Sequence, residues 1–123
     1  MSHSDLVRTF IAAWEARNTE AILAMMTSDA RYLNVGLPEA VGHEAIRAFV
    51  APFLAGASQV EWTVHHIAET ADGVVMTERT DVFVLGDRRL EIAVMGVFEF
   101  RDDKISAWRD YFDVPAFQRQ MAG

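Results

Sequence analysis

VVMTERTDVFVL, residues 74–85, places a guanidinium and a carboxylate inside a run of β-branched and apolar residues. Such a run, bounded by turn residues, predicts a long strand. Because side chains on a strand alternate between its two faces, Arg79, Asp81 and Phe83 share one face. Charged side chains are seldom buried unless they are paired. The stretch therefore predicts an Arg79–Asp81 pair that points into the protein interior.

A second stretch near the C-terminus, WRDYFD at residues 108–113, has the same character. Alternation puts Trp108, Asp110 and Phe112 on one face, so that a carboxylate is flanked by two aromatic rings. Asp113 falls on the other face, and no catalytic role is expected for it. The inward carboxylate is Asp110.

One guanidinium with two carboxylates, Arg79 with Asp81 and Asp110, leaves one negative charge in excess. In a low-dielectric interior the two carboxylates are expected to share a proton, which gives one acid and one base. That pair can add water across a polar bond without a metal. Tyr32 and Asn34, on the inward face of a predicted strand, could hold the water. From the pattern alone, a structural buried salt bridge is the alternative.

The remaining chain predicts an α+β fold. Helical spacing of apolar residues indicates helices over 5–17, after residue 19 and between 42 and 56, with Ser4 and Thr19 as N-caps and Ser28-Asp29 ending the second helix. Alternation indicates strands over 30–35, 60–68, 74–85, 90–100 and 105–112, followed by a terminal helical turn at 116–121. We expect the N-terminal helices to cover one face of a cone-shaped, strongly curved sheet with mixed or antiparallel pairing. Such a cone encloses a cavity.

Length and composition set further limits. The 123 residues fit one domain, 1–123, and 51% of them are hydrophobic. The net charge of −7 argues against nucleic acid and anionic membranes as partners. No cysteine is present, and the N-terminal residues resemble no targeting segment. We expect a soluble, cytoplasmic protein.

Other kinds of chemistry find little support in the sequence. His65 and His66 are adjacent on a predicted strand, so their rings are expected on opposite faces, and neither His3 nor His43 has ligand spacing to them. Because catalytic metals need three or more converging ligands, no metal site is expected. The chain has no glycine-rich phosphate loop and no Gly-x-Ser-x-Gly motif. No cofactor is expected.

The wall of the cavity is predicted to be apolar. Five residues with inward parity, or on the first helix, are the expected substrate-binding positions: Phe83, Ile92, Val94, Phe112 and Trp14. An apolar wall raises the pKa of a neutral acid and excludes bulk water. An apolar substrate is therefore expected.

These motifs together resemble the limonene-1,2-epoxide hydrolase family, within the wider group similar to nuclear transport factor 2 (NTF2) and the SnoaL polyketide cyclases. The resemblance rests on the segments 77–82, 96–98 and 108–113, on Tyr32-Leu33-Asn34 and on Leu37-Pro38. It extends from the first helix to about residue 117. The Arg-x-Asp and Trp-Arg-Asp-Tyr-Phe-Asp elements are specific, whereas the wider fold is not specific for function.

The resemblance implies a role for each polar residue. Asp81 corresponds to the general acid that protonates the epoxide oxygen, and Asp110 to the general base. Tyr32 and Asn34 correspond to the residues that position the attacking water, and Arg79 to the arginine that bridges the carboxylates. The family opens the ring in one step without a covalent ester, unlike the α/β-hydrolase epoxide hydrolases.

The expected function is a cofactor-free epoxide hydrolase that converts an apolar epoxide to a vicinal diol. Two alternatives stay open: a proton-transfer enzyme such as a steroid isomerase or polyketide cyclase, and a non-catalytic module that binds small molecules. A homodimer is expected, because the family usually pairs through its sheet and the strands carry apolar residues on both faces, for example Ala93, Met95 and Val97 opposite Val94.

Overall fold

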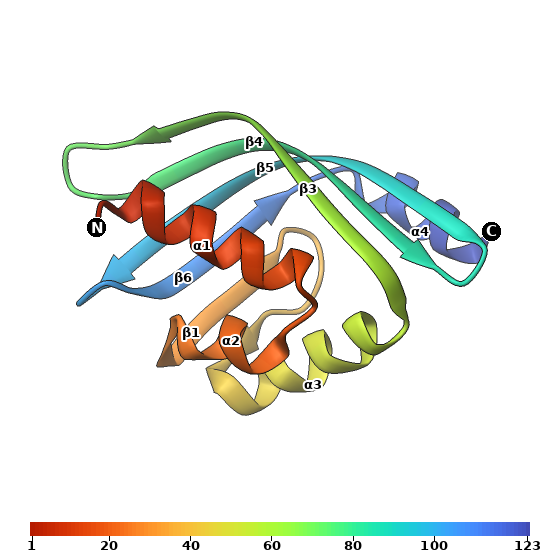
Figure 1. Ribbon diagram of the computed structural model, residues 1–123, viewed down its shortest axis with the longest axis horizontal. Helices are drawn as coiled ribbons and strands as arrows, with labels where there is room; N and C mark the ends of the chain where they lie inside the picture. Colours follow the sequence, from red (N-terminus) through yellow and green to blue (C-terminus); the bar gives the residue numbers. More distant parts are fainter.

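The computed structural model describes all residues 1–123 and has the α+β fold that the sequence predicts (Figure 1). Its elements in chain order are α1 (His3–Glu15), α2 (Thr19–Ala24), β1 (Met26–Asn34), β2 (Ala40–Val41), α3 (Gly42–Ala55), β3 (Ala57–Glu69), β4 (Val75–Leu85), β5 (Arg88–Arg101), β6 (Lys104–Tyr111) and α4 (Val114–Ala122). None of these helices has the length and apolar content needed to cross a membrane.

One mixed sheet contains all the strands, in the order β2-β1-β6-β5-β4-β3. Every neighbouring pair is antiparallel except β1 with β6, which run parallel. The long strands β3, β4 and β5 curve around α1, and α2 and α3 lie below them on the same side (Figure 1). The helices therefore cover one face of the curved sheet, and the core lies between the two layers.

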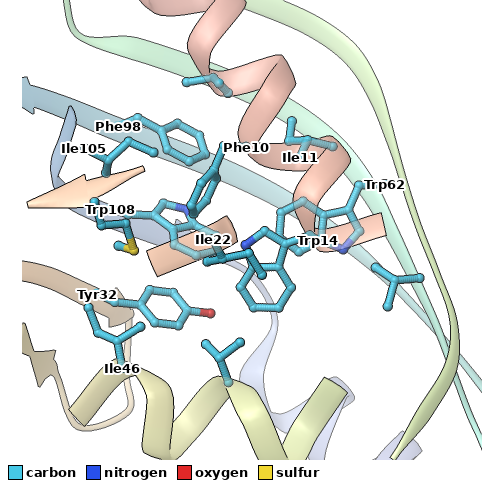
Figure 2. Close-up of a cluster of buried hydrophobic side chains, with 14 of the residues drawn as sticks. Phe10, Ile11, Trp14, Ile22, Tyr32, Ile46, Trp62, Phe98, Ile105 and Trp108 are labelled. Carbon is cyan, nitrogen blue, oxygen red and sulfur yellow. The ribbon is translucent and has the colours of Figure 1, made fainter. Parts of the chain in front are cut away.

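An aromatic cluster fills the space between α1 and the sheet (Figure 2). Phe10 and Trp14 project from α1 on the same face because they are four residues apart on the helix. Trp14 stacks on Trp62 of β3 with ring centroids 4.8 Å apart, and Phe10 meets Trp108 of β6 edge-on at 5.1 Å. These contacts fix α1 across the sheet.

The predicted helix caps were each displaced. Ser2, not Ser4, accepts the capping hydrogen bond at the start of α1, and the Ser4 hydroxyl instead donates to Glu69 of β3. Asn18, not Thr19, caps α2. In both places a polar residue close in sequence to the predicted one serves as the cap, and at α1 the predicted residue is engaged by Glu69 instead.

The first strand is longer than predicted. Ser28 and Asp29 lie within β1 rather than at the end of a helix, and both are exposed in a segment where the register with β6 shifts. The two-residue strand β2 has no sequence signal of its own, since it exists only by pairing with Arg31 and Tyr32 of β1. The end of α3 at Gly56 agrees with the prediction.

The two adjacent histidines do not point to opposite faces as predicted. His65 contacts the Thr80 hydroxyl at 2.7 Å and His66 contacts Glu78 at 2.8 Å, and both partners lie on the same, outer face of β4. A register shift between β3 and β4 at residues 64–66 is the cause, because an extra residue in a strand interrupts alternation.

The last helix covers the part of β5 that β6 does not reach. β6 pairs with β5 only from Met95 onward, which leaves the earlier backbone groups of β5 unpaired on that side. Gln120 of α4 accepts a hydrogen bond from the Glu91 amide and donates one to the Glu91 carbonyl. α4 thus protects this edge, and it also brings its inner side to the rim of the cavity described below.

Candidate active site

Three charged side chains meet in the interior, and we call them the buried triad: Arg79 and Asp81 of β4 and Asp110 of β6. Arg79 binds Asp81 in bidentate fashion, with Nε 3.0 Å from Oδ1 and Nη2 2.9 Å from Oδ2. The same guanidinium reaches Asp110, with Nη2 2.9 Å from Oδ2 and Nη1 3.3 Å from Oδ1. One guanidinium therefore bridges two carboxylates.

The side chains of the triad come from two strands that are not neighbours, and they meet over the strand between them. β5 lies between β4 and β6, and its residue opposite Asp110 is Gly96. A Cβ atom at Gly96 would lie 2.7 Å from Asp110 Oδ1 and would collide with Arg79 Nη1. Arg79 can therefore reach Asp110 only because this position has no side chain. A glycine in the interior of a strand is a known signal for such a close approach, and sequence reasoning assigned it no role here.

Burial dominates the electrostatics of the triad. Arg79, Asp81 and Asp110 are 1%, 3% and 5% exposed. Burial raises the pKa of Asp81 to about 6, although Arg79 opposes the rise. Burial also raises the pKa of Asp110, against the effects of Arg79 and Trp108. With both carboxyl groups easier to protonate and one cation between them, the triad favours holding one proton on the pair.

Arg79 itself stays charged. Burial would lower the pKa of its guanidinium, but the two carboxylates raise the pKa above its usual value. Thr77 Oγ1 accepts a further hydrogen bond from Arg79 Nη1 at 3.0 Å, and the Trp62 ring lies 4.7 Å from the guanidinium carbon. These contacts hold the cation in one orientation.

Tyr32 and Asn34 lie beside Asp110 because β1 and β6 pair in parallel. The register places Tyr32 next to Trp108 and Asn34 next to Asp110. The Tyr32 hydroxyl donates to Asn34 Oδ1 at 3.3 Å. Burial raises the pKa of Tyr32 well above its usual value, so its hydroxyl stays protonated as a donor. A hydroxyl and an amide thus stand together beside the carboxylate.

A cavity of about 110 Å³ opens onto these groups. Its lining contains Tyr32, Asn34, Asp81 and Asp110 together with the five predicted substrate-binding residues, Trp14, Phe83, Ile92, Val94 and Phe112. Arg79 is not among the lining residues and acts on the cavity through the carboxylates that it holds. The structure therefore brings all ten predicted positions together.

Five further lining residues were not predicted as part of the site: Leu37, Phe49, Phe53, Trp62 and Phe117. Phe49 and Phe53 are four residues apart on α3, so the helical pattern put them on one face without showing what that face covers. Trp62 packs in the core as well as lining the cavity. Phe117 comes from α4, whose position depends on the open edge of β5.

Asp113 takes no part in the cavity, in keeping with its predicted orientation. Its Oδ1 accepts the Ala116 amide at 3.0 Å and caps α4. A carboxylate close in sequence to Asp110 therefore serves to start a helix.

The fold belongs to the NTF2-like and cystatin-like class. An NTF2-like protein from Burkholderia pseudomallei matches with a TM-score of 0.87 at 17% identity, and the match covers 100% of both chains. A cystatin-fold protein from Novosphingobium aromaticivorans matches with a TM-score of 0.77 at 21% identity over 89% of this chain and 97% of that one. At this level of identity the likeness concerns the fold alone.

The chain belongs to the limonene-1,2-epoxide hydrolase catalytic domain family, which it matches over residues 1–122. Epoxide hydrolase EphG of Mycobacterium tuberculosis is 36% identical over 109 residues, which is 88% of this chain and 71% of that protein. The structure of an LEH-like epoxide hydrolase from M. tuberculosis matches with a TM-score of 0.83 at 30% identity, over 98% of this chain and 89% of that chain. These matches confirm the resemblance found in the sequence.

Proposed function

We propose that residues 1–123 form one NTF2-like domain that hydrolyses an apolar epoxide to a vicinal diol, in one general acid/base step and without a metal or other cofactor. Membership of the epoxide hydrolase family supports the reaction class. The observation that carries the mechanism is the buried triad, in which one guanidinium holds two carboxylates at the end of an apolar cavity.

In this proposal one carboxyl group acts as the general acid and the other as the general base. Asp81, in its neutral form, protonates the epoxide oxygen as the C–O bond breaks. Asp110, in its ionised form, takes a proton from the water whose oxygen attacks the ring carbon. The water oxygen ends on one carbon, the epoxide oxygen becomes the second hydroxyl, and one proton has moved from Asp81 while one has arrived at Asp110. Proton exchange between the two carboxyl groups, or with solvent, then restores the starting state.

The attacking water would bind beside Asp110, between groups that can form hydrogen bonds with it. The Tyr32 hydroxyl and the Asn34 amide stand next to this carboxylate through the parallel β1–β6 register. A water that donates to Asp110 and is held by Asn34 and Tyr32 would be oriented for attack before the epoxide binds, which lowers the entropic barrier.

The hydrogen bonds of Asp110 hold its carboxylate in one orientation. Its Oδ1 accepts from Trp108 Nε1 and Arg79 Nη1, and its Oδ2 accepts from Arg79 Nη2. These donors stabilise the ionised form, which is the form that can accept a proton from water.

The cavity wall favours substrates with hydrocarbon substituents. Eleven of its fourteen lining residues are hydrophobic, and the aromatic side chains on the wall come from both the sheet and the helices. Burying such substituents against these rings contributes binding free energy, while the epoxide oxygen is the one atom that needs a polar partner. Terpene, alkene and lipid epoxides fit this description.

We also propose a homodimer that pairs through the outer face of the sheet. Met76, Met95 and Tyr111 are exposed there, on β4, β5 and β6. Apolar side chains that no helix of the chain covers favour a protein partner.

We also propose that the protein is located in the cytoplasm.

Diol formation tests the proposal. We expect purified protein to convert at least one of limonene oxide, cyclohexene oxide, styrene oxide and a long-chain fatty epoxide to its diol, with chelator present. Asp81→Asn and Asp110→Asn should each lower kcat by about 10³-fold or more, because each removes one partner in proton transfer. Asp113→Asn is the matched control, since that carboxylate caps α4, and it should retain wild-type turnover.

Two results would contradict the proposal. Near wild-type turnover in either active-site variant would remove the acid and base roles. If the folded wild-type protein converts none of the epoxides but shifts a proton within an unsaturated ketone, the isomerase alternative replaces hydrolysis.

A further inference from the structure

We propose that Trp108 is a positioning residue for the hydrolytic step: its indole holds Asp110 in the ionised, base form and fixes the Tyr32 ring beside the water site. This inference deepens the function proposed above and rests on it. Trp108 contributes nothing to the cavity lining, so its role is exerted through its two neighbours.

The indole distinguishes the two carboxyl groups. Each of them accepts two hydrogen bonds from Arg79, so the guanidinium alone treats Asp81 and Asp110 almost alike. Trp108 Nε1 adds a third hydrogen bond, to Asp110 Oδ1 at 2.8 Å, and Asp81 has no equivalent. A hydrogen bond from a neutral donor to a buried carboxylate favours its ionised form. The indole hydrogen bond therefore stabilises the ionised form of Asp110 and not that of Asp81, which suits Asp110 to the role of base.

The same indole is held rigidly between two rings. Trp108 lies between Phe98 and Tyr32 (Figure 2). The ring centroids are 5.6 and 4.2 Å from that of the indole, and the interplanar angles are 14° and 11°. Phe10 meets the indole edge-on at 5.1 Å. Trp108 is 1% exposed. A side chain packed on both faces cannot turn its N–H away from Asp110, and the stacked Tyr32 ring is fixed with it.

The other two tryptophans show that this hydrogen bond is specific. Trp14 and Trp62 belong to the same aromatic cluster, yet neither of their buried indole N–H groups has a hydrogen-bond partner. Packing in this core therefore does not by itself supply an acceptor for an indole. Of the three indole N–H groups, only that of Trp108, two residues before Asp110 on the same face of β6, donates to a carboxylate.

The proton affinity of Asp110 depends on few other groups. Arg79 and Asp81 face it from β4, and Tyr32 faces it from β1. Gly96, opposite it on β5, contributes no titratable group. Removing the indole N–H should thus raise the pKa of Asp110 while these groups stay in place, and the base should become ionised only at higher pH.

The test uses two replacements at Trp108 in the full chain. Trp108→Phe keeps a ring between Tyr32 and Phe98 and removes the donor. Replacement of Trp108 by β-(3-benzothienyl)alanine keeps both fused rings and exchanges only the N–H for sulfur, so it should fold even if Phe leaves a harmful void. Phe98→Leu is the control, because it loosens the packing around the indole and keeps its N–H.

Two readouts are compared, and the first does not depend on turnover. Titration of ¹³C-labelled aspartate carboxyl groups by NMR, with Asp110 assigned through Asp110→Asn, should show a midpoint about one pH unit higher in both Trp108 variants. The acidic limb of kcat/KM should move upward by a similar amount, with kcat lowered about tenfold and KM little changed. Phe98→Leu should lower stability and leave both midpoints at the wild-type value.

The outcomes separate the two proposals. If the Asp110 midpoint in both Trp108 variants equals that of the wild type, or moves equally in Phe98→Leu, the positioning role is wrong. If the midpoint moves as expected but wild-type protein converts no epoxide, Trp108 still sets the ionisation of Asp110 and the hydrolase proposal fails.

Discussion

Two sets of arginine–carboxylate pairs lie on opposite faces of the same sheet, and they behave differently. The buried triad has one arginine for two carboxylates on the inner face, with an Arg79 side chain of zero exposure. On the outer face, three arginines each bind one carboxylate: Arg31 with Glu39, Arg101 with Asp29 and Arg109 with Glu99. We call this second set the outer pairs.

The two sets use the same residue types and alternate along the same strands. Arg109 of an outer pair directly precedes Asp110 of the triad, and Arg31 directly precedes Tyr32. The outer pairs are charge-balanced and reach solvent, so water can replace either partner. The triad has two carboxylates for one guanidinium, in a place where water cannot screen their repulsion. Stoichiometry and burial, rather than the presence of an ion pair, therefore account for the raised pKa values of the triad carboxyl groups.

The largest difference between the two sets should appear when the arginine is removed. Arg79→Met leaves two buried carboxylates without a cation, and we expect the free energy of unfolding to fall by about 3–5 kcal/mol at neutral pH. Arg109→Met removes an outer arginine and should cost about 1 kcal/mol or less. Urea denaturation of both variants measures the contrast. Equal losses in the two variants would show that burial does not separate the sets.

Alternation along the strands made much of the site predictable from sequence. The inward parity of Arg79, Asp81 and Asp110 needs only a period of two, because β4 pairs with β5 in regular register throughout and β6 pairs with β5 in regular register from Ala107 to Tyr111. The same rule failed at His65 and His66, where a register shift interrupts the alternation. Local parity is therefore reliable only where the pairing is regular.

The rest of the site depends on contacts between distant parts of the chain. The parallel pairing of β1 with β6 puts Asn34 beside Asp110, and no local pattern specifies that partner. The same holds for Phe49 of α3 and Phe117 of α4, which close the cavity from helices whose placement is set by packing. Gly96 carried a signal in its residue type, but its meaning required knowing that Arg79 crosses β5.

The buried triad and the outer pairs should also differ in how their contributions to the free energy of unfolding change with pH. The pKa of Asp81 rises from 3.8 in the unfolded chain to about 6 through burial. Its contribution to stability is therefore complete below about pH 4 and is lost as the pH rises through about 6. The free energy of unfolding of the wild type, relative to Asp81→Asn, should fall by about 3 kcal/mol between pH 3 and pH 7.

The outer pairs should show the opposite sign. Arg101 lowers the pKa of Asp29, so the stability that this carboxylate contributes is present at neutral pH and is lost on acidification. Denaturation curves of wild type, Asp81→Asn and Asp29→Asn at pH values between about 2.5 and 7.5 measure both trends, because the Asp29 contribution is lost only below about pH 4. If the difference between wild type and Asp81→Asn does not depend on pH, Asp81 does not carry a raised pKa.

A smaller effect should follow from filling the space that the triad needs. Gly96→Ala puts a methyl group against Arg79 and Asp110, and we expect it to lower stability by about 1–3 kcal/mol and to lower kcat more than KM. Gly56→Ala is the matched control, since its new Cβ would have no neighbour closer than 3.7 Å. Thermal unfolding and diol formation measure both variants. Wild-type turnover in Gly96→Ala would mean that the triad tolerates displacement.

The most direct test of the account is a single turnover in ¹⁸O-labelled water, with the protein in excess over a converted epoxide. Attack by a water activated by Asp110 predicts that the first diol formed carries one ¹⁸O atom and that the mass of the protein does not change. An unlabelled diol, with ¹⁸O found afterwards in a peptide that contains Asp81 or Asp110, would show a covalent ester and contradict the acid and base roles of the buried triad.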